Sequence, residues 1–264
     1  MCVPGCLEAI VRGSRRGLLA PPEPTGGRPS DRPGALRSFS RVVDLTHAVG
    51  PDFPSFDPRP SLITETVATL RRDGYNMRRW HLIEHTGTHL DAPIHYADDG
   101  TSADCLEIED LVAPLVVVDI AARAQDNPDT QLTPDDLLAF EVAHGPIPAH
   151  SCVAMCSGWD RLVTSPRFCN ADEQGLMHFP SFHPDAAALL IERDVRGLAV
   201  DTLSLDHGVS RDFPTHRAWL PTGRWGLEAV ANLGALPPVG ATIVVGGPKI
   251  EGATGGSARV LALV

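Results

Sequence analysis

Residues 85–95 read His85-Thr86-Gly87-Thr88-His89-Leu90-Asp91-Ala92-Pro93-Ile94-His95. Three histidines and one aspartate therefore lie within eleven residues, and the stretch contains no cysteine. Imidazole nitrogen and carboxylate oxygen together suit zinc, manganese or another first-row divalent cation. We interpret this stretch as half of a catalytic metal site.

The backbone here is expected to be extended and turned rather than helical, because Gly87 indicates a turn and Pro93 follows closely. His89 and Asp91 face the same side of an extended segment, and the glycine lets His85 fold back toward them. One cation held by these three side chains keeps a coordination position open for water, as in catalytic sites. The alternative is a polar loop whose histidines only hydrogen-bond the backbone, but the four ligand-type side chains together favour the metal site.

The string H-x-G-T-H-x-D-A-P-x-H resembles the signature of the cyclase-type metal-dependent hydrolases, a family that includes bacterial kynurenine formamidases and isatin hydrolases. The resemblance continues in the family's order through nearly the whole chain, from about Val42 to Val264. The matching segments are Val200 to Asp206, Phe213 to His216, Leu227-Glu228, Asn232-Leu233, Pro248 to Ile250 and Gly252 to Arg259. Together they make the resemblance specific.

The resemblance implies the rest of the site. His216 and Glu228 match the family's remaining metal ligands, Asp91 matches a carboxylate that bridges two ions, and His95 matches the residue that donates and accepts protons. Two divalent cations are therefore expected, zinc first and manganese as the alternative, on His85, His89, Asp91, His216 and Glu228. Taken alone, His216 is typical of a loop or core histidine and Glu228 of a solvated helix charge.

The departures from the family pattern lie on the substrate side. Kynurenine formamidases have a substrate-binding tryptophan in a proline-rich N-terminal loop, and Phe53 stands there in this chain. Phenylalanine keeps the stacking face and lacks the indole donor, so we expect Phe53 to lie over the open face of the metal site. Gly226 stands where bulkier residues are usual, and Ser257 where proline is common. Hydrolysis should be retained, and the identity of the substrate is left open.

Three functions are compatible with these residues. The first is an arylformamidase-like amide hydrolase, with the conversion of N-formylkynurenine to kynurenine in tryptophan catabolism as the reference reaction. The second uses the same metal chemistry to open a cyclic amide or lactone, as isatin hydrolases do, or to serve a cyclase step in a specialised pathway. Phe53 favours this second reading for the physiological substrate without reversing the order. The third is a non-catalytic metal-binding protein, which the presence of His95 disfavours.

Length, composition and charge limit the classes of partner that the protein can have. The chain has 264 residues, of which 43% are hydrophobic, enough for one substantial core, and no apolar run approaches the about 20 residues that span a bilayer. The formal charge of −11 opposes nonspecific binding to nucleic acid. We expect a small-molecule amide or lactam as substrate and no nucleic-acid or membrane partner. The resemblance implies that the chain assembles into a homodimer or a larger homo-oligomer.

The first forty residues differ from the rest. Prolines and glycines are frequent between Pro21 and Gly34, which predicts a flexible N-terminal extension over residues 1–40. Ser14 to Leu19 resembles a twin-arginine export motif, but prolines replace the apolar region that should follow. We therefore expect a cytoplasmic protein, with the extension as a degenerate export signal and periplasmic export as the alternative.

Residues 41–264 alternate short apolar runs with helical patterns, which indicates a single α/β domain. Helices are expected to begin after Thr133 and His183, because proline and aspartate follow each. Strands are predicted over 42–45, 61–70, 77–83, 116–120, 152–156, 198–200, 243–245 and 260–264. Local pattern leaves the strand order open, and the resemblance implies a swivelling β/β/α architecture with a mixed sheet.

Overall fold

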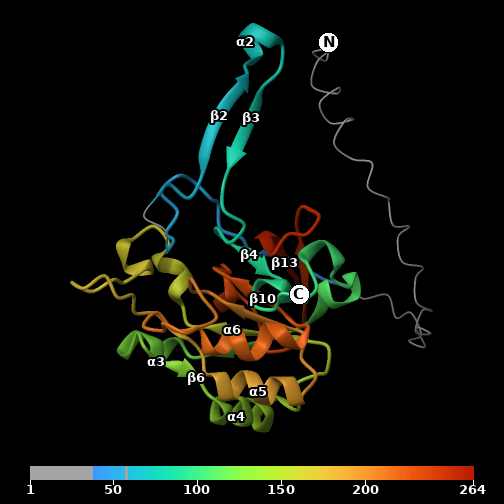
Figure 1. Cartoon of the computed structure of the whole chain (residues 1–264). Helices are drawn as coiled ribbons and strands as arrows, with labels where there is room; N and C mark the ends of the chain where they lie inside the picture. The colour runs from blue at the N-terminus through green and yellow to red at the C-terminus, as the bar shows by residue number, and fades with distance from the viewer. Residues whose placement is uncertain (1–37, 57–58) are drawn as a thin grey trace. The chain divides into compact units, whose positions relative to one another are not determined.

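A nine-stranded sheet organises the protein (Figure 1). The computed structural model describes residues 38–56 and 59–264, and residues 39–264 form one unit. The strand order in the large sheet is β1-β13-β11-β5-β7-β9-β10-β4-β12. The predicted α/β class with a mixed sheet is confirmed. Apart from residues 38–40, the predicted extension over 1–40 lies outside the described residues.

The centre of the sheet is parallel and its flanks are antiparallel. β5, β7, β9 and β10 pair in parallel, whereas β4 runs antiparallel to β10 and to β12. The strands are β1 (Val42–Asp44), β4 (His89–Asp91), β5 (Val112–Asp119), β7 (Cys152–Cys156), β9 (Gly197–Val200), β10 (Trp225–Glu228), β11 (Ala241–Gly246), β12 (Gly255–Ser257) and β13 (Arg259–Leu263). Every predicted strand is found, β7 with the predicted ends and the others with shifted ends, whereas β4, β10 and β12 of this sheet were not predicted as strands.

The helices begin where sequence signals predict them. Thr133 and Asp136 form a capping box at the start of α4, and His183 Nδ1 accepts a hydrogen bond from Asp185 N at the start of α5. The α-helices are α2 (Leu70–Asp73), α3 (Ala121–Asp126), α4 (Pro134–His144), α5 (Pro184–Glu192) and α6 (Pro214–Trp219). Single 3-10 turns are η1 (Pro93–His95), η2 (Ala103–Cys105), η3 (Ile108–Leu111), η4 (Trp159–Leu162), η5 (Pro166–Phe168), η6 (Leu220–Thr222) and η7 (Leu233–Ala235).

Alternating side chains of the central strands supply two cores, one on each face of the sheet. Leu115 and Val117 of β5 belong to the core shared with β10, β11 and β13. Val116 and Val118 point the other way and pack with residues of α4, α5 and α6, which lie along that face in Figure 1. A smaller aromatic core lies beside the sheet and contains Phe53, Trp159, Phe168, Phe179, Leu203 and Ala229.

A two-stranded hairpin extends away from the rest of the unit, with α2 at its tip (Figure 1). It consists of β2 (Ile63–Ala68) and β3 (Met77–His81), and Ala68 is the one buried residue of these two strands. Several large apolar side chains are exposed on it, and Trp80 is 68% exposed. A further small parallel sheet joins β6 (Gln131–Leu132) to β8 (Ser181–Phe182).

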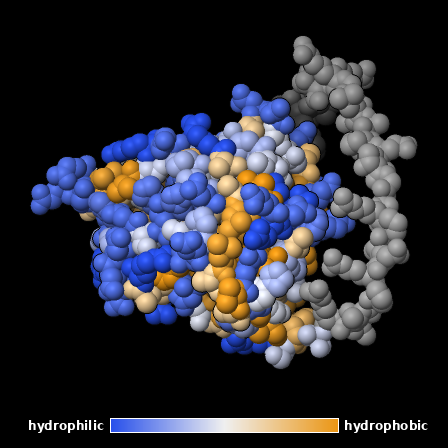
Figure 2. Space-filling model, turned by 90° about the horizontal axis from the view of Figure 1, so that it is seen from below, coloured by the Kyte–Doolittle hydropathy of each residue, from blue (hydrophilic) through white to orange (hydrophobic). Residues whose placement is uncertain are grey.

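One face of the molecule is mainly hydrophilic. Figure 2 views the molecule from below, and apolar patches interrupt a largely hydrophilic face there. Within the described ranges, every helix is too short or too polar to cross a bilayer.

Candidate metal centre

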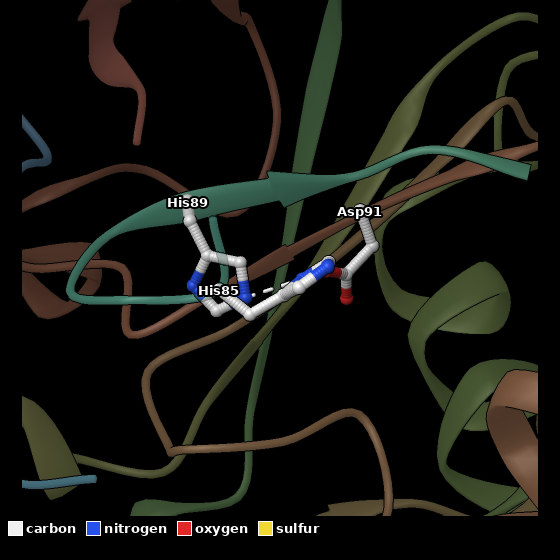
Figure 3. Close-up of side chains that lie close together, drawn as sticks. All are labelled: His85, His89 and Asp91. Atoms are coloured by element: carbon white, nitrogen blue, oxygen red, sulfur yellow. Dashed lines mark hydrogen bonds and ion pairs between the residues drawn. The ribbon is translucent and has the colours of Figure 1, made fainter. Parts of the chain in front are cut away.

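The motif of residues 85–95 folds into a turn followed by strand β4. Gly87 adopts φ +70°, and the chain reverses there so that the His85 ring returns toward the strand (Figure 3). Because side chains two residues apart in a strand share a face, His89 and Asp91 lie on one side of β4. Asp91 Oδ1 is 2.6 Å from His85 Nδ1 and 3.3 Å from His89 Nε2. The structure thus brings the three nearby ligand candidates together.

Strand β10 supplies the second half of the site. It pairs antiparallel with β4 in a register that sets Glu228 opposite His89 and Gly226 opposite Asp91. Paired residues of neighbouring strands share a face, so the Glu228 carboxylate reaches the same space. A Cβ at Gly226 would lie 2.8 Å from Leu205 Cδ1, which explains the glycine at a position where bulkier residues were expected.

Helix α6 brings His216 into the same group. Its Nε2 lies 3.1 Å from Glu228 Oε1 and 3.5 Å from Asp91 Oδ2. Asp91 is therefore shared by two sets of three potential ligands: His85, His89 and Asp91, and Asp91, His216 and Glu228. Within each set the ligand atoms lie within 4.8 Å of one another. A carboxylate with two oxygens facing two ligand sets has the arrangement required of a bridging ligand.

Hydrogen bonds behind the site orient two of its histidines. His216 Nδ1 lies 2.6 Å from Asp206 Oδ2, and the Asp206 carboxylate also accepts the backbone N–H groups of Thr215 and His216. His89 Nδ1 lies 2.8 Å from the Gly87 carbonyl oxygen. An acceptor at Nδ1 holds the proton there and directs the Nε2 lone pair to the centre. Asp206, which lies beyond the end of β9, thus supports His216 from outside the two ligand sets.

A second aspartate beyond β9 supports loops of the fold rather than a ligand candidate. The buried carboxylate of Asp201 accepts hydrogen bonds from Ser157 and from Trp159 N. Burial raises the pKa of Asp201 to about 7, although these hydrogen bonds oppose the shift. Asp201 therefore joins the loop after β7 to the end of β9, and Asp206 makes the contact to a ligand candidate.

Charges at the centre strongly perturb its titration. Burial by itself lowers the pKa of His89, but the carboxylates of Asp91 and Glu228 overcome this effect and raise the pKa to about 10. Burial likewise lowers the pKa of His216, but the nearby carboxylates of Asp206, Asp91 and Glu228 outweigh it and raise the pKa well above its ordinary value. Burial raises the pKa of Asp91, yet His89 and the other two histidines hold it well below its usual range.

The residues fit a divalent cation. His89 Nε2 and Asp91 Oδ2 are buried and have no hydrogen-bond partner among the residues that the structure describes. Unpaired buried polar atoms are costly unless something else satisfies them. Nitrogen and carboxylate ligands converging on such atoms are the donor set of zinc and manganese sites. The site can therefore hold metal.

Metal uptake should release protons, and affinity should rise with pH. Without a cation, His89, with its pKa of about 10, and His216 are protonated near neutral pH, and both must lose a proton to bind an ion. Calorimetric titration with Mn²⁺, repeated at one pH in two buffers of different ionisation enthalpy, should report release of about one proton or more. A binding enthalpy that is the same in both buffers would contradict this linkage.

A cavity of about 580 Å³ opens over the two ligand sets. His95 lines it and stacks on His85 with ring centroids 3.9 Å apart and planes inclined by 22°. Burial lowers the pKa of His95, an effect that Asp91 partly offsets. Tyr96 packs against the His216 ring at 4.8 Å. The cavity thus places a histidine with a lowered pKa beside the candidate ligands.

The substrate-side expectation for Phe53 needs correction. Phe53 is 8% exposed and packs in the aromatic core, with its ring 6.3 Å from that of Phe168, and it is not among the residues lining the cavity. Phe56 lies three residues later in the same loop, lines the cavity and is 53% exposed. The proline-rich loop does reach the cavity, but the phenylalanine that faces it is Phe56.

Strand β3 and the two residues after it also contribute to the cavity wall. His81 lines the cavity together with Leu82 and Ile83, and its Nε2 pairs with Glu65 Oε1 at 3.0 Å. Trp80, the residue before His81, is exposed. The hairpin therefore forms part of the cavity wall near its base.

Comparison with known proteins identifies the family. A family model described as putative cyclase matches residues 43–207. This chain belongs to that cyclase family. The match spans β1 to the segment after β9 and includes the whole of the motif at residues 85–95.

Relatives of this cyclase-family chain carry two activities in their names. It is 35% identical to an isatin hydrolase of Roseibium aggregatum over an alignment 243 residues long, which covers 84% of this chain and 91% of the relative. It is 27% identical to a kynurenine formamidase of Salinibacter ruber over 199 residues, covering 75% and 85% of the two chains.

Solved structures agree with the sequence comparison. An isatin hydrolase bound to the product analogue thioisatinate superposes with a TM-score of 0.80 at 33% identity, covering 84% of this chain and 92% of that chain. Isatin hydrolase A from Ralstonia solanacearum superposes with a TM-score of 0.79 at 37% identity, covering 85% and 92%. The expected fold family and relationship are thus confirmed.

Proposed function

We propose that this cyclase-family protein is a divalent-cation-dependent hydrolase that opens the ring amide of an isatin-type lactam. The observation that carries the proposal is the Asp91 carboxylate shared by two ligand sets. The other members of these sets line the cavity together with His95. The similarity to isatin hydrolases at 33–37% identity over most of both chains supports the choice of substrate.

Hydrolysis of an amide joins a water oxygen to the carbonyl carbon and breaks the bond from that carbon to nitrogen. A cation on the ligand sets would polarise the carbonyl and lower the pKa of the attacking water. His95 accepts the proton of that water and returns it to the leaving nitrogen, and its lowered pKa keeps the ring neutral and ready to accept. Asp206 and the Gly87 carbonyl hold His216 and His89 in place during the cycle.

Cleavage of an N-formyl aryl amide is the second candidate, and the similarity to kynurenine formamidases supports it. The two reactions share the bond type and the same machinery. They differ in whether the acid and the amine that hydrolysis forms stay in one molecule or separate into two. The substrates therefore differ in shape, and the shape of the cavity wall decides which of them is bound. The formamidase reaction was placed first from sequence alone, and the similarity to isatin hydrolases now favours the ring-opening reaction.

Zinc is the proposed ion, with manganese as the alternative, because the site combines imidazole and carboxylate ligands without thiolate. Two ions are proposed because Asp91 presents one oxygen to His85 and His89 and the other to His216.

We further propose a homo-oligomer in which a second copy covers the exposed apolar side chains of the hairpin, among them Val67, Met77 and Trp80. Sedimentation of the purified chain measures its assembly state, and a monomer at all concentrations would exclude this part of the proposal.

Purified protein loaded separately with Zn²⁺ and Mn²⁺ should be assayed against isatin, N-formylkynurenine and a simple lactone. We expect the highest kcat/KM on isatin, with measurable activity on the formyl amide. If the wild type were no more active than Asp91→Asn on each of the three substrates, the proposed function would be refuted. A clear preference for N-formylkynurenine would select the second candidate.

Phe56→Ala should raise KM for an aromatic amide by about 3- to 10-fold, which corresponds to the free energy of one aromatic contact. The metal content should be unchanged. Phe56 faces the cavity with half of its side chain exposed, so its ring is available to a flat substrate. Phe53→Ala is the matched control and should instead lower stability by about 3 kcal/mol or more, because it empties a buried site. Steady-state kinetics and thermal denaturation separate the two effects, and an unchanged KM for Phe56→Ala would remove this residue from the substrate site.

A further inference from the structure

The third histidine of the site has a partner from the far end of the chain. His85 Nε2 lies 2.9 Å from Thr254 Oγ1, whereas its Nδ1 faces Asp91. Thr254 immediately precedes β12, which pairs with β4 in a register that sets Gly255 opposite Asp91. The Thr254 hydroxyl donates to Glu84 Oε2 at 2.5 Å, and the Thr254 backbone N–H reaches the same oxygen at 3.3 Å. Glu84, Thr254 and His85 form one chain of hydrogen bonds.

The direction of this chain follows from counting protons. A threonine hydroxyl has one proton and two lone pairs. The proton goes to the Glu84 carboxylate, so toward His85 the hydroxyl can only accept. Nε2 of His85 must then carry a hydrogen, so Nδ1 is the ring nitrogen that can offer its lone pair to a bound cation. Nδ1 is the atom that faces the first ligand set.

Close backbone packing makes this contact possible. A Cβ on Gly255 would lie 2.6 Å from His85 Cε1 and 2.4 Å from the Leu90 carbonyl oxygen. Only a residue without a side chain therefore lets β12 approach the His85 ring so closely. The face of the His85 ring is covered by His95, which stacks on it with ring centroids 3.9 Å apart. His85 is thus held at its ring face and at both ring nitrogens.

We propose that Thr254, backed by Glu84, is a positioning residue that fixes His85 with its proton on Nε2 and its Nδ1 lone pair directed to the cation. This inference rests on the metal site of the proposed function. It gives His85 the counterpart of what Asp206 does for His216 and the Gly87 carbonyl does for His89. In each case an acceptor outside the ligand set holds the nitrogen that does not face the centre.

The test compares Thr254→Val, which keeps the shape and removes the hydroxyl, with Thr254→Ser, which keeps the hydroxyl. Dissociation constants for Mn²⁺ and Zn²⁺, measured by competition with a chelator, should rise by about 10- to 100-fold in Thr254→Val and change little in Thr254→Ser. Glu84→Gln should give an intermediate loss, because a glutamine amide can donate to the hydroxyl and let it donate to His85 instead. Thermal denaturation of the metal-free variants checks that each is folded.

A second readout does not need the metal. In metal-free protein labelled with ¹⁵N-histidine, the wild type and Thr254→Ser should show a slowly exchanging Nε2–H signal from His85, identified by its loss in His85→Gln. Thr254→Val should lose that signal. Wild-type metal affinity in Thr254→Val, or a His85 proton found on Nδ1 alone, would overturn the proposal. A wild-type protein that binds neither ion would instead refute the proposed function, and the His85 signal would then report separately on the hydrogen bond from Thr254.

Discussion

Asp91→Asn should leave the protein without bound divalent cation and without hydrolytic activity. Loss of an outer hydrogen-bond partner of a metal ligand costs about 10- to 100-fold in affinity, and loss of a charged ligand shared by both sets should cost more than that. The neutral amide also removes the negative charge that faces three histidines, His85, His89 and His216. Both ions should therefore leave together rather than one after the other.

Elemental analysis of the purified variant, together with titration by Mn²⁺, measures this effect. Asp98→Asn is the matched control, because Asp98 is exposed in the loop after η1 and its substitution makes the same change of charge. Metal content equal to that of the wild type in Asp91→Asn would exclude the bridging role. Loss of one ion and retention of the other would assign Asp91 to a single ligand set.

His95→Ala should lower kcat by about 100-fold or more while the metal stays bound, because that is the usual scale for a positioned proton-transfer group. His95 lines the cavity, and no ligand set contains it. It contacts the centre by stacking on His85 and by an edge-on approach to the His216 ring, and alanine removes both contacts without removing a ligand. The expected signature is therefore a large fall in kcat with a small change in metal content.

Single-turnover kinetics and metal analysis on the same preparation check this prediction. His183→Ala serves as the control for the loss of one imidazole, because His183 caps α5 and lies outside the cavity lining. If His95→Ala emptied the centre of metal, His95 would have to be reassigned as a ligand. If kcat stayed near the wild-type value, the proton would have to move through another group of the cavity.

The half of the site that lies close together in sequence could be predicted from residue types alone. His85, His89 and Asp91 are separated by a glycine turn and by the two-residue period of a strand, so local geometry is sufficient to bring them together. Nothing local links them to Glu228, which meets His89 only because β10 pairs with β4 in one register. His216 and Glu228 were therefore accessible only through the family resemblance.

The missed supporting residues show a second limit. Thr254 lies in a glycine-rich stretch where one hydroxyl among several looks ordinary, and Glu84 resembles any polar residue before a motif. Their contact requires β12 to lie beside β4, a pairing between residues far apart in sequence. Phe53 and Phe56 illustrate the same point at the substrate side. Both belong to one proline-rich loop, and only the packing of Phe53 against Phe168 decides which ring remains for the cavity.

The cavity joins two parts of the molecule with very different resistance to local opening. Its floor belongs to β4 and β10, whose residues are all buried, whereas the wall at Ile63 and His81 belongs to a hairpin with exposed strands. A two-stranded hairpin is marginal by itself, so its backbone amides should exchange with solvent far sooner than those of the floor. We therefore expect this wall to adjust to bound molecules of different shape, while the distances between the metal-ligating atoms of the floor stay fixed. A second copy packed on the hairpin would stiffen that wall, and subunit association would then narrow the range of molecules admitted.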